Sequence, residues 1–261
     1  MKKKIVSWIK EQVRNSGAKG IVVGLSGGID SALVAALAKE AIGAKRLLAF
    51  FLPCKSHPLD LQDARIVAKE MGIETKTLDL SGIYNSLIRI LPPAGNLARN
   101  NLKPRLRMLV LYYFANKLNY LVCGTGNKSE IAIGYFTKHG DGATDILPIG
   151  DLLKKDVRRL AQELKIPQRI ITKPPTAGLW PGQTDEGEMG ILYPELDDIL
   201  GRIEHKKKQI LPKVKVHLVE GMIKRSEHKR QAPKICRVKN IKTPRIARSK
   251  ISHNRQRHGL F

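Results

Sequence analysis

The sequence has few cysteines and shows no disulfide or zinc pattern. Cys54, Cys123 and Cys236 are the three cysteines of the 261-residue chain, and no Cys-x-x-Cys pair occurs. An odd number of widely spaced cysteines argues against a disulfide framework and favours free thiols in a reducing compartment. The seven histidines include no His-Glu-x-x-His pair, so the sequence lacks the helical zinc-hydrolase motif.

Long apolar runs are also missing. The run from Leu47 to Leu52, for example, is far too short to cross a bilayer. The Met-Lys-Lys-Lys start is followed by Lys10 and Glu11 rather than by a secretory apolar region. We therefore expect a cytoplasmic protein without a membrane partner. With 42% hydrophobic residues, the chain can bury the core of one large domain.

Acidic residues are scarce relative to basic ones. The chain contains 47 Lys and Arg against 23 Asp and Glu, which gives a formal net charge of +24. From Arg202 onward, 19 basic residues face 3 acidic ones. This surplus predicts an anionic partner such as a nucleotide, a nucleic acid or a membrane surface, without choosing among them.

The sequence does contain a turn of small residues. It lies between an apolar run, Ile21 to Val23, and a run of helix formers, Ala32 to Ala41. This strand–turn–helix context favours a phosphate cradle, because glycines let backbone N–H groups approach an anion at the positive end of a helix. The turn consists of Gly24, Leu25, Ser26, Gly27, Gly28, Ile29, Asp30 and Ser31. No Gly-Lys-Ser/Thr follows, so the turn is not a Walker A loop.

Asp30 is the unusual member of this turn. A carboxylate beside phosphate is unfavourable unless a divalent cation lies between them, so we interpret Asp30 as a magnesium ligand. The alternative is a tight turn with an ordinary N-capping acid.

The rest of the chain alternates apolar runs with helical patterns. Strands are expected at Ile21–Val23, Leu47–Leu52, Glu74–Leu78 and Tyr120–Cys123. Strand–helix–strand units with continuous apolar strands predict an α/β fold, with a parallel twisted sheet covered by helices on both faces. One long helix is expected over Asn96–Leu118, interrupted by the awkward Pro104, with Leu106, Leu109, Tyr113 and Leu118 as its buried stripe.

A second small-residue turn, Gly124 to Glu130, follows the fourth expected strand. Because ligands bind outside the carboxyl ends of parallel strands, both turns are expected to face one site. Thr125 is a candidate donor to ribose or phosphate, and Glu130 is a candidate to share magnesium with Asp30. Glu130 as a solvated helix acid is the alternative.

Two irregular stretches, Tyr135–Asp145 and Thr172–Glu188, lie on either side of an expected helix that begins at Lys154. Loops of this length suggest mobile covers over a pocket. Lys138, Lys154 and Lys173 are candidates to bind phosphates. Arg105 and Arg107 lie two residues apart on a helix, so at most one of them is expected to face the site.

The Ser-Gly-Gly-Ile-Asp-Ser string resembles the signature of the ATP pyrophosphatase family, which has the adenine nucleotide alpha hydrolase-like fold. More specifically, the chain resembles NAD synthetases of the short, ammonia-dependent type. The matching segments are Gly24–Ser31, Arg105–Met108, Gly124–Glu130, Phe136–Asp145, Lys173–Thr176, Gly182–Glu186 and His228–Lys229. They run in family order over roughly residues 3–238.

The resemblance implies ATP-dependent amidation of deamido-NAD to NAD by ammonia, through an adenylated intermediate, with release of AMP and pyrophosphate. It places the ATP phosphates on the Gly24–Ser31 turn, and further ATP contacts on Thr125, Lys154 and Thr176. It places magnesium (Mg2+) on Asp30 and Glu130. It assigns deamido-NAD to Arg105, Lys138, Asp145, His228 and Lys229, keeps Asp141 and Asp145 as catalytic candidates, and implies a homodimer with the dinucleotide bound across the interface.

Several alternatives stay open on the sequence. No glutamine-hydrolysing domain precedes the first motif, so free ammonia is the expected nitrogen source unless a separate glutaminase docks. The synthetase domain is expected over 1–240, followed by a basic tail, 241–261. That tail keeps two rival functions in view, a transfer-RNA-modifying ATP pyrophosphatase of the thiolation or lysidine type and a basic nucleic-acid-binding protein with a degenerate ATP fold.

Overall fold

The computed structural model describes residues 1–180, 182–236 and 238. The chain divides into two compact units, Met1–Arg230 and Gln231–Phe261, and the description below concerns the first. The expected basic tail, 241–261, lies outside the described residues, so the predicted domain boundary stays a prediction. None of the helices in the described ranges combines the length and the apolar character needed to cross a membrane.

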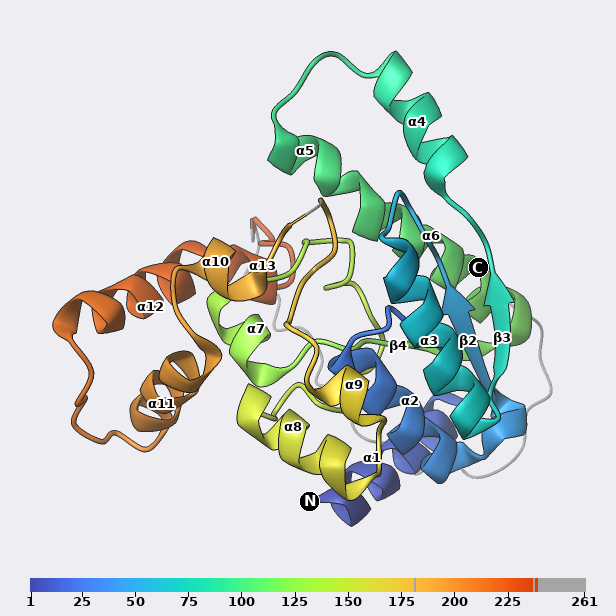
Figure 1. The fold of residues 1–261 in the computed structure, drawn as a ribbon, viewed down its shortest axis with the longest axis horizontal. Coiled ribbons are helices and arrows are strands. Elements are labelled where there is room, and N and C mark those ends of the chain that lie inside the picture. Colours follow the sequence, from blue (N-terminus) through green and yellow to red (C-terminus); the bar gives the residue numbers. More distant parts are fainter. Residues whose placement is uncertain (181, 237, 239–261) are drawn as a thin grey trace. The chain divides into compact units, whose positions relative to one another are not determined.

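A four-stranded parallel sheet lies at the centre of this unit (Figure 1). The strand order is β3-β2-β1-β4. The strands are β1 (Gly20–Gly24), β2 (Leu47–Phe51), β3 (Glu74–Thr77) and β4 (Tyr120–Cys123). The four strands and their parallel pairing confirm the expected α/β fold.

Side chains of the central strands are buried on both faces of the sheet. Ile21 and Val23 of β1 pack into the core on one face, whereas Val22 packs into the core on the other. Val22 is paired in register with Leu48 of β2 and Val122 of β4, which belong to the same core. This explains why the strands appear in the sequence as unbroken apolar runs.

Helices cover the two faces unequally (Figure 1). One face packs against α1 (Lys2–Ser16), α2 (Ile29–Ile42), α3 (Pro58–Met71), α8 (Lys154–Glu163) and α9 (Gln168–Ile171). The other face packs against α4 (Ser81–Ile90) and α6 (Leu102–Leu118). A short 3-10 turn, η1 (Ala44–Arg46), connects α2 to β2.

A third hydrophobic core lies beside the sheet. Leu196, Ile199 and Val219 are at its centre and are essentially inaccessible to solvent. The elements that build it are α7 (Lys128–Ile133), α10 (Asp185–Met189), α11 (Tyr193–Glu204) and α12 (Lys213–Arg225). The unit ends with α13 (Glu227–Arg230).

The expected helix over Asn96–Leu118 is wrong as a single element. The chain forms α5 (Asn96–Asn100) and then α6, with Asn101 between them. Pro104 is the third residue of α6, where a backbone N–H has no partner within the helix, so the proline fits without breaking it.

The expected buried stripe of this helix is also partly wrong. Leu109 and Tyr113 are 68% and 61% exposed. Leu106 and Leu118, by contrast, pack against the core on this face of the sheet. The apolar residues of α6 therefore cover two faces, of which only one meets the sheet.

Candidate active site

The first predicted turn connects β1 to α2. β1 ends at Gly24 and α2 begins at Ile29, so the strand leads directly into the positive end of a 14-residue helix. Gly28 is the N-cap residue, and no side chain caps it. The free N–H groups at this end are therefore available to an anion.

Gly27 shapes the turn from behind. Its φ is +81°, and a Cβ atom built there would lie 2.3 Å from the carbonyl oxygen of Asp60 in α3. Both the left-handed backbone and the close approach of α3 require glycine at this position. Gly27 thus allows close contact between the turn and α3, and it does not line the cavity.

The two serines of the turn bond to each other and to the turn. The Ser31 hydroxyl accepts a hydrogen bond from the Ser26 N–H at 3.2 Å and donates to the Gly28 carbonyl at 2.9 Å. The Ser26 and Ser31 hydroxyl oxygens lie 3.1 Å apart. These bonds hold the turn in shape in the ligand-free protein.

The second predicted turn lies beside the first. β4 is the parallel neighbour of β1, so the two strands end at the same edge of the sheet. After Cys123 the chain reaches α7, whose N-cap is Asn127. The Asn127 side chain accepts from the Glu130 N–H, and the Glu130 carboxylate accepts from the Asn127 N–H, which forms a capping box.

Lys154 connects the two turns. Its ammonium group lies 2.5 Å from Asp30 Oδ2 and 3.3 Å from Glu130 Oε1. The Asn127 side-chain amide donates to Asp30 Oδ1 at 2.9 Å. Lys154 is only 1% exposed, so this is a buried ion-paired cluster made from residues far apart in the sequence. The structure therefore brings Asp30, Glu130 and Lys154 together, and their binding of magnesium and ATP stays a prediction.

Burial and charge act together on this cluster. Burial raises the pKa of Glu130 to about 7, against the opposing effect of Lys154. For Lys154, burial alone would lower the pKa, but the charges of Asp30 and Glu130 outweigh it and the pKa is raised. The Tyr193 hydroxyl donates toward Glu130 Oε1 at 3.3 Å and Asp185 Oδ2 at 3.0 Å, so the cluster continues to α10 and α11.

Asp30 and Glu130 are the carboxylates of this cluster that could hold magnesium together with phosphate oxygens. Magnesium in nucleotide enzymes is held by one or two protein carboxylates together with phosphate oxygens. Both carboxylates approach the ammonium of Lys154, at 2.5 and 3.3 Å, so the cluster contains one positive charge of the chain's own. Among the described residues there is no group of three or more His, Cys, Asp or Glu side chains that could hold a metal ion.

A cavity of about 660 Å³ opens at this edge of the sheet. It is lined by both turns, by the start of α6, by the two irregular segments and by α13. The predicted ATP, magnesium and dinucleotide residues line it, with the exceptions of Gly27 and Asp145. Thr125 and Thr176 are among the lining residues, and the Thr176 hydroxyl accepts from the Gly178 N–H at 3.1 Å.

The predicted dinucleotide residues are linked by hydrogen bonds on the part of the cavity wall that α6, the loop after α7 and α13 form. Arg105 donates to the Lys138 carbonyl at 3.3 Å, and the Lys138 ammonium donates to the His228 carbonyl at 2.8 Å. Lys229 donates to the carbonyls of Gly134 and Phe136 at 2.7 and 2.9 Å. These contacts fix the loop after α7 against α13.

The two arginines of α6 both line the cavity, so the expectation that at most one faces the site is wrong. Arg107 donates to the Leu52 carbonyl at 3.0 Å and to the Ser56 hydroxyl at 3.1 Å. Arg105 reaches the opposite wall at Lys138. Spacing along a helix limits where a side chain starts, but long arginines can reach around a helix end that borders a cavity.

Asp141 and Asp145 have different surroundings. Asp141 accepts from the Thr137 N–H at 2.9 Å at the cavity wall, and loss of hydration raises the pKa of its carboxyl. Asp145 uses both oxygens on the protein, accepting from the Val122 N–H at 2.7 Å and the Tyr112 hydroxyl at 3.0 Å. Asp145 therefore ties the loop to β4 and α6, and its assignment as a catalytic or dinucleotide-contacting residue stays a prediction.

The segment Thr172–Glu188 lines another side of the cavity, and two of its described residues, Lys173 and Leu179, hold it to α3 and α6. Lys173 pairs with Asp60 and Asp63 of α3, each at 2.7 Å. Lys103 of α6 donates to the Leu179 carbonyl. The expected irregular stretch gives way to α10 from Asp185 onward.

A sequence model of the NAD synthase family matches residues 1–233. The chain belongs to the NAD synthase family. It is 47% identical over 240 residues to the "NH(3)-dependent NAD(+) synthetase" of Archaeoglobus fulgidus, covering 91% of this chain and 96% of that relative. The family assignment thus rests on nearly the whole Met1–Arg230 unit rather than on the motifs alone.

Solved structures give the same NAD synthase fold. The "NMN synthetase" of Francisella tularensis superposes with a TM-score of 0.83 at 39% identity, covering 90% of this chain and 96% of that one. The "NH3-dependent NAD synthetase" of Campylobacter jejuni superposes with a TM-score of 0.79 at 30% identity, with 90% and 97% coverage.

Sequence reasoning missed Tyr193 and the role of Asn127 in this NAD synthase chain. Tyr193 is 1% exposed, and the Lys154 ammonium lies 4.8 Å from its ring centre. Its position at the start of a helix is typical of a core aromatic, so no pattern marked it. Asn127, by contrast, was detectable as the first residue of an Asn-x-x-Glu capping box.

Proposed function

We propose that the chain catalyses the ATP-dependent amidation of deamido-NAD to NAD with ammonia. The observation that carries this proposal is the convergence of Asp30, Glu130 and Lys154 between two adjacent strand tips in one cavity. The family assignment supports it. ATP is the proposed co-substrate, with its phosphates on the Gly24–Ser31 turn.

The first chemical step makes a poor electrophile reactive. A carboxylate oxygen of the nicotinate attacks the α-phosphorus of ATP, and the bond to the β-phosphate oxygen breaks, which releases pyrophosphate. The N–H groups at the start of α2 and the ammonium of Lys154 stabilise negative charge that develops on the leaving group. Asp30 and Glu130 would hold Mg2+, which supplies further charge stabilisation when bound.

The second step forms the amide. The ammonia nitrogen attacks the acyl carbon, the bond from that carbon to AMP breaks, and the nitrogen loses a proton. Asp141, at the cavity wall and with a raised pKa, is the proposed acceptor of this proton. Water would destroy the same intermediate, so the proposed task of the Tyr135–Asp145 and Thr172–Glu188 segments is to exclude it.

The dinucleotide is proposed to lie against the part of the cavity wall formed by α6, the loop after α7 and α13. Arg105, Lys138 and Lys229 supply positive charge there, beside His228, which matches a pyrophosphate-bearing substrate. The side chains of Arg105, Lys138 and Lys229 donate to backbone carbonyls. The substrate would therefore exchange some of these bonds for bonds to its own oxygens.

A homodimer is part of the proposal. Leu97 of α5 and Leu109 and Tyr113 of α6 are each more than 60% exposed, and the same helices border the dinucleotide end of the cavity. Apolar side chains of this size on adjoining elements favour a protein partner. A cytoplasmic location and the use of free ammonia rather than a docked glutaminase stay predictions.

One reaction mixture tests the proposal. Protein, Mg2+, ATP, deamido-NAD and ammonium are expected to yield NAD, AMP and pyrophosphate in equal amounts, measured by chromatography. Omitting ammonium should stop NAD formation. ATP consumption that yields ADP and phosphate instead of AMP would contradict the proposed cleavage between the α- and β-phosphates.

Synthesis of NMN from the corresponding mononucleotide is a second candidate, favoured by the likeness to the Francisella tularensis structure. The same assay with nicotinic acid mononucleotide in place of deamido-NAD separates the two. A higher kcat/KM for the mononucleotide would select the second candidate without changing the assigned chemistry.

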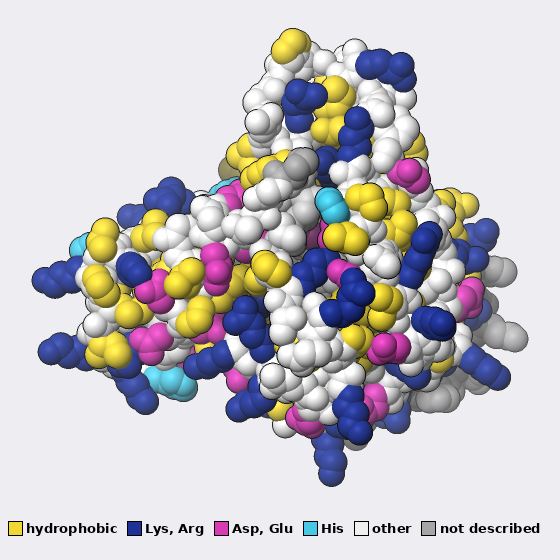
Figure 2. All heavy atoms as spheres, viewed as in Figure 1, with side chains coloured by type: hydrophobic (Ala, Val, Ile, Leu, Met, Phe, Trp, Pro, Cys, Tyr) yellow, Lys and Arg dark blue, Asp and Glu magenta, His cyan; other side chains and the backbone are white. Residues whose placement is uncertain are grey.

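The transfer-RNA-modifying and nucleic-acid-binding alternatives gain no support from the relatives reported above. Lys and Arg side chains are scattered over the visible face rather than gathered in one stripe (Figure 2), and nucleic-acid binding is favoured by a continuous basic patch. The site acids expected to be lost from a degenerate ATP fold, Asp30 and Glu130, are both in place.

A further inference from the structure

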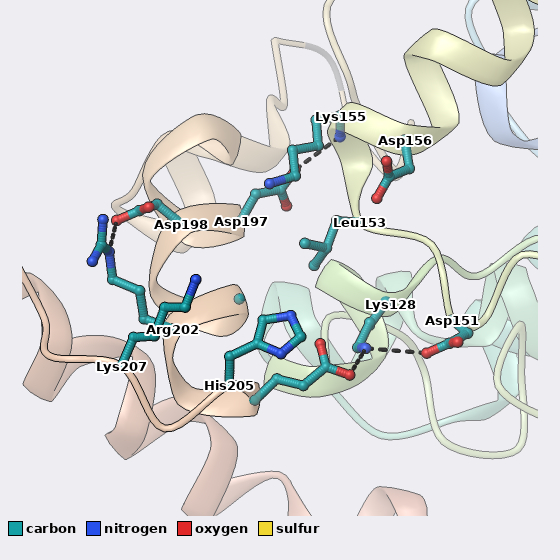
Figure 3. A pocket seen from close by; sticks show the side chains of 12 residues that line it. Lys128, Asp151, Leu153, Lys155, Asp156, Asp197, Asp198, Arg202, His205 and Lys207 are labelled. Atoms are coloured by element: carbon teal, nitrogen blue, oxygen red, sulfur yellow. Dashed lines mark hydrogen bonds and ion pairs between the residues drawn. The ribbon is translucent and has the colours of Figure 1, made fainter.

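A charged groove of about 420 Å³ lies between α7, α8 and α11, the helices next to the cluster of Asp30, Glu130 and Lys154 (Figure 3). Several of its charges are paired on its surface. Lys128, for example, lies 3.0 Å from Asp151 and 2.7 Å from Glu204. Asp197 differs from these surface pairs because it is only 2% exposed. A buried carboxylate needs hydrogen-bond donors to compensate for lost hydration.

Both oxygens of Asp197 have such donors. Oδ1 accepts from the Ser129 hydroxyl at 2.5 Å, and Oδ2 accepts from the Lys155 N–H at 2.8 Å. The Ser129 oxygen in turn accepts from the Lys154 N–H at 3.0 Å. Ser129 is completely buried. The chain of contacts therefore runs from α11 through α7 to the start of α8.

These contacts supply the cap that α8 lacks locally. The residue before the helix is Leu153, whose side chain cannot cap. Lys154 and Lys155 are the first two residues of α8, and their N–H groups have no partner within the helix. Ser129 accepts from the Lys154 N–H and Asp197 accepts from the Lys155 N–H. The negative charge of the Asp197 carboxylate is also stabilised by the positive end of the helix.

The residues held in this way adjoin the proposed ATP and magnesium residues. Lys154 places its ammonium between Asp30 and Glu130, and Ser129 immediately precedes Glu130 in α7. We propose that Asp197 is a positioning residue for ATP binding, which fixes the starts of α7 and α8 so that Lys154 and Glu130 keep their geometry. This inference rests on the proposed function.

The test compares Asp197→Asn with Asp198→Asn. Asp198 is the next residue of α11, but its carboxylate is partly exposed and pairs with Arg202 of the same helix, at 2.8 Å. The amide at position 197 keeps the shape and loses the charge and one accepted bond. Binding of a non-hydrolysable ATP analogue with Mg2+ is measured by calorimetry. The stoichiometry gives the fraction of protein that is folded, and the Kd gives the affinity of the folded protein for the analogue.

Asp197→Asn is expected to raise the Kd of the analogue about tenfold, as loss of an outer partner of a ligating group typically does. The KM for deamido-NAD should change less, because none of its proposed contacts lies on α8 or α11. Asp198→Asn should change neither quantity. A wild-type Kd for Asp197→Asn would overturn the inference.

Ser129→Ala gives a second test that removes only a hydroxyl group. It should raise the Kd of the analogue in the same direction, and it decides the matter if Asp197→Asn does not fold. In the double variant the two effects should be less than additive, because the two residues share the hydrogen bond between Ser129 and Asp197. A wild-type Kd for Ser129→Ala, or full additivity, would contradict the inference.

Failure of the proposed function looks different. In that case wild-type protein would bind no ATP analogue or form no NAD under the assay described above. Wild-type activity combined with an unaffected Asp197→Asn variant would leave the proposed function in place and reject only the positioning role.

Discussion

At the scale of single residues, Lys154 is the residue on which the site converges. It is buried, and both of its charged partners come from other elements, Asp30 from α2 and Glu130 from α7. A buried ion pair is strongly destabilised when one partner is removed, because the remaining charge is left without compensation. The cluster is thus sensitive to any change of charge, in stability as well as in activity.

Asp30→Asn is expected to lower kcat about 100-fold or more, because the amide cannot balance a divalent cation beside phosphate. NAD formation at saturating substrates is the measurement. Glu40→Gln provides the matched control, since Glu40 is also on α2 and, within the described part of the chain, forms a surface ion pair with Lys2 at 3.3 Å. Near-normal turnover by Asp30→Asn would reject its assignment as a metal ligand.

The cysteines allow a prediction about thiol reactivity. Burial raises the pKa values of Cys54 and Cys123, so little thiolate is present at neutral pH. Cys236 is exposed. A colourimetric thiol reagent at pH 7.5 should therefore titrate one thiol in the native protein and all three in denaturant. Reaction of two or more native thiols would show that one of the buried sites opens readily.

At the scale of elements, the strands and most helices follow from the sequence, because buried parallel strands and capped helices leave local patterns. The junction at Asn101 does not, since the apolar spacing continues across it. Leu109 and Tyr113 were expected to be buried because periodicity shows that a face is apolar, not what covers it. Tertiary context decides between a core face and an exposed one.

The site was predictable to the extent that it lies on the strand tips. The Gly24–Ser31 turn and Glu130 were found because small residues after a strand have few other uses. Tyr193 and Asp197 were missed because each reads as an ordinary residue of an amphipathic helix. Their roles depend on which helix they face, and a single sequence does not encode that locally.

The segment Thr172–Glu188 is expected to be protected when both substrates bind. Chymotrypsin can cut after Leu179, and this cut should slow when the ATP analogue and deamido-NAD are added together, because the segment orders over them. Mass spectrometry identifies the fragment. Trypsin cleavage in the exposed run Lys206–Lys208 should continue at the same rate, and equal slowing of both cuts would reject a local cover.

At the scale of the whole molecule, the exposed apolar side chains of α5 and α6 predict association. Leu109→Glu should convert the proposed homodimer to a monomer, because a carboxylate would be buried without a partner in the interface. Light scattering after gel filtration measures the mass. Val214→Glu, at an α12 position that is 72% exposed, is the matched control and should leave the mass unchanged. A monomeric wild-type protein would reject the homodimer.

The pairing of β1 with β4 joins Gly20 to Tyr120, one hundred positions further along the chain. Lys154, which completes the cluster between their tips, comes later still. A chain emerging from the ribosome therefore carries its glycine-rich turn long before Glu130 and Lys154, two other residues proposed to bind ATP and magnesium, have been synthesised. ATP bound at this cluster can stabilise only a chain that has already brought these distant segments together, so the early stages of folding must proceed without that contribution.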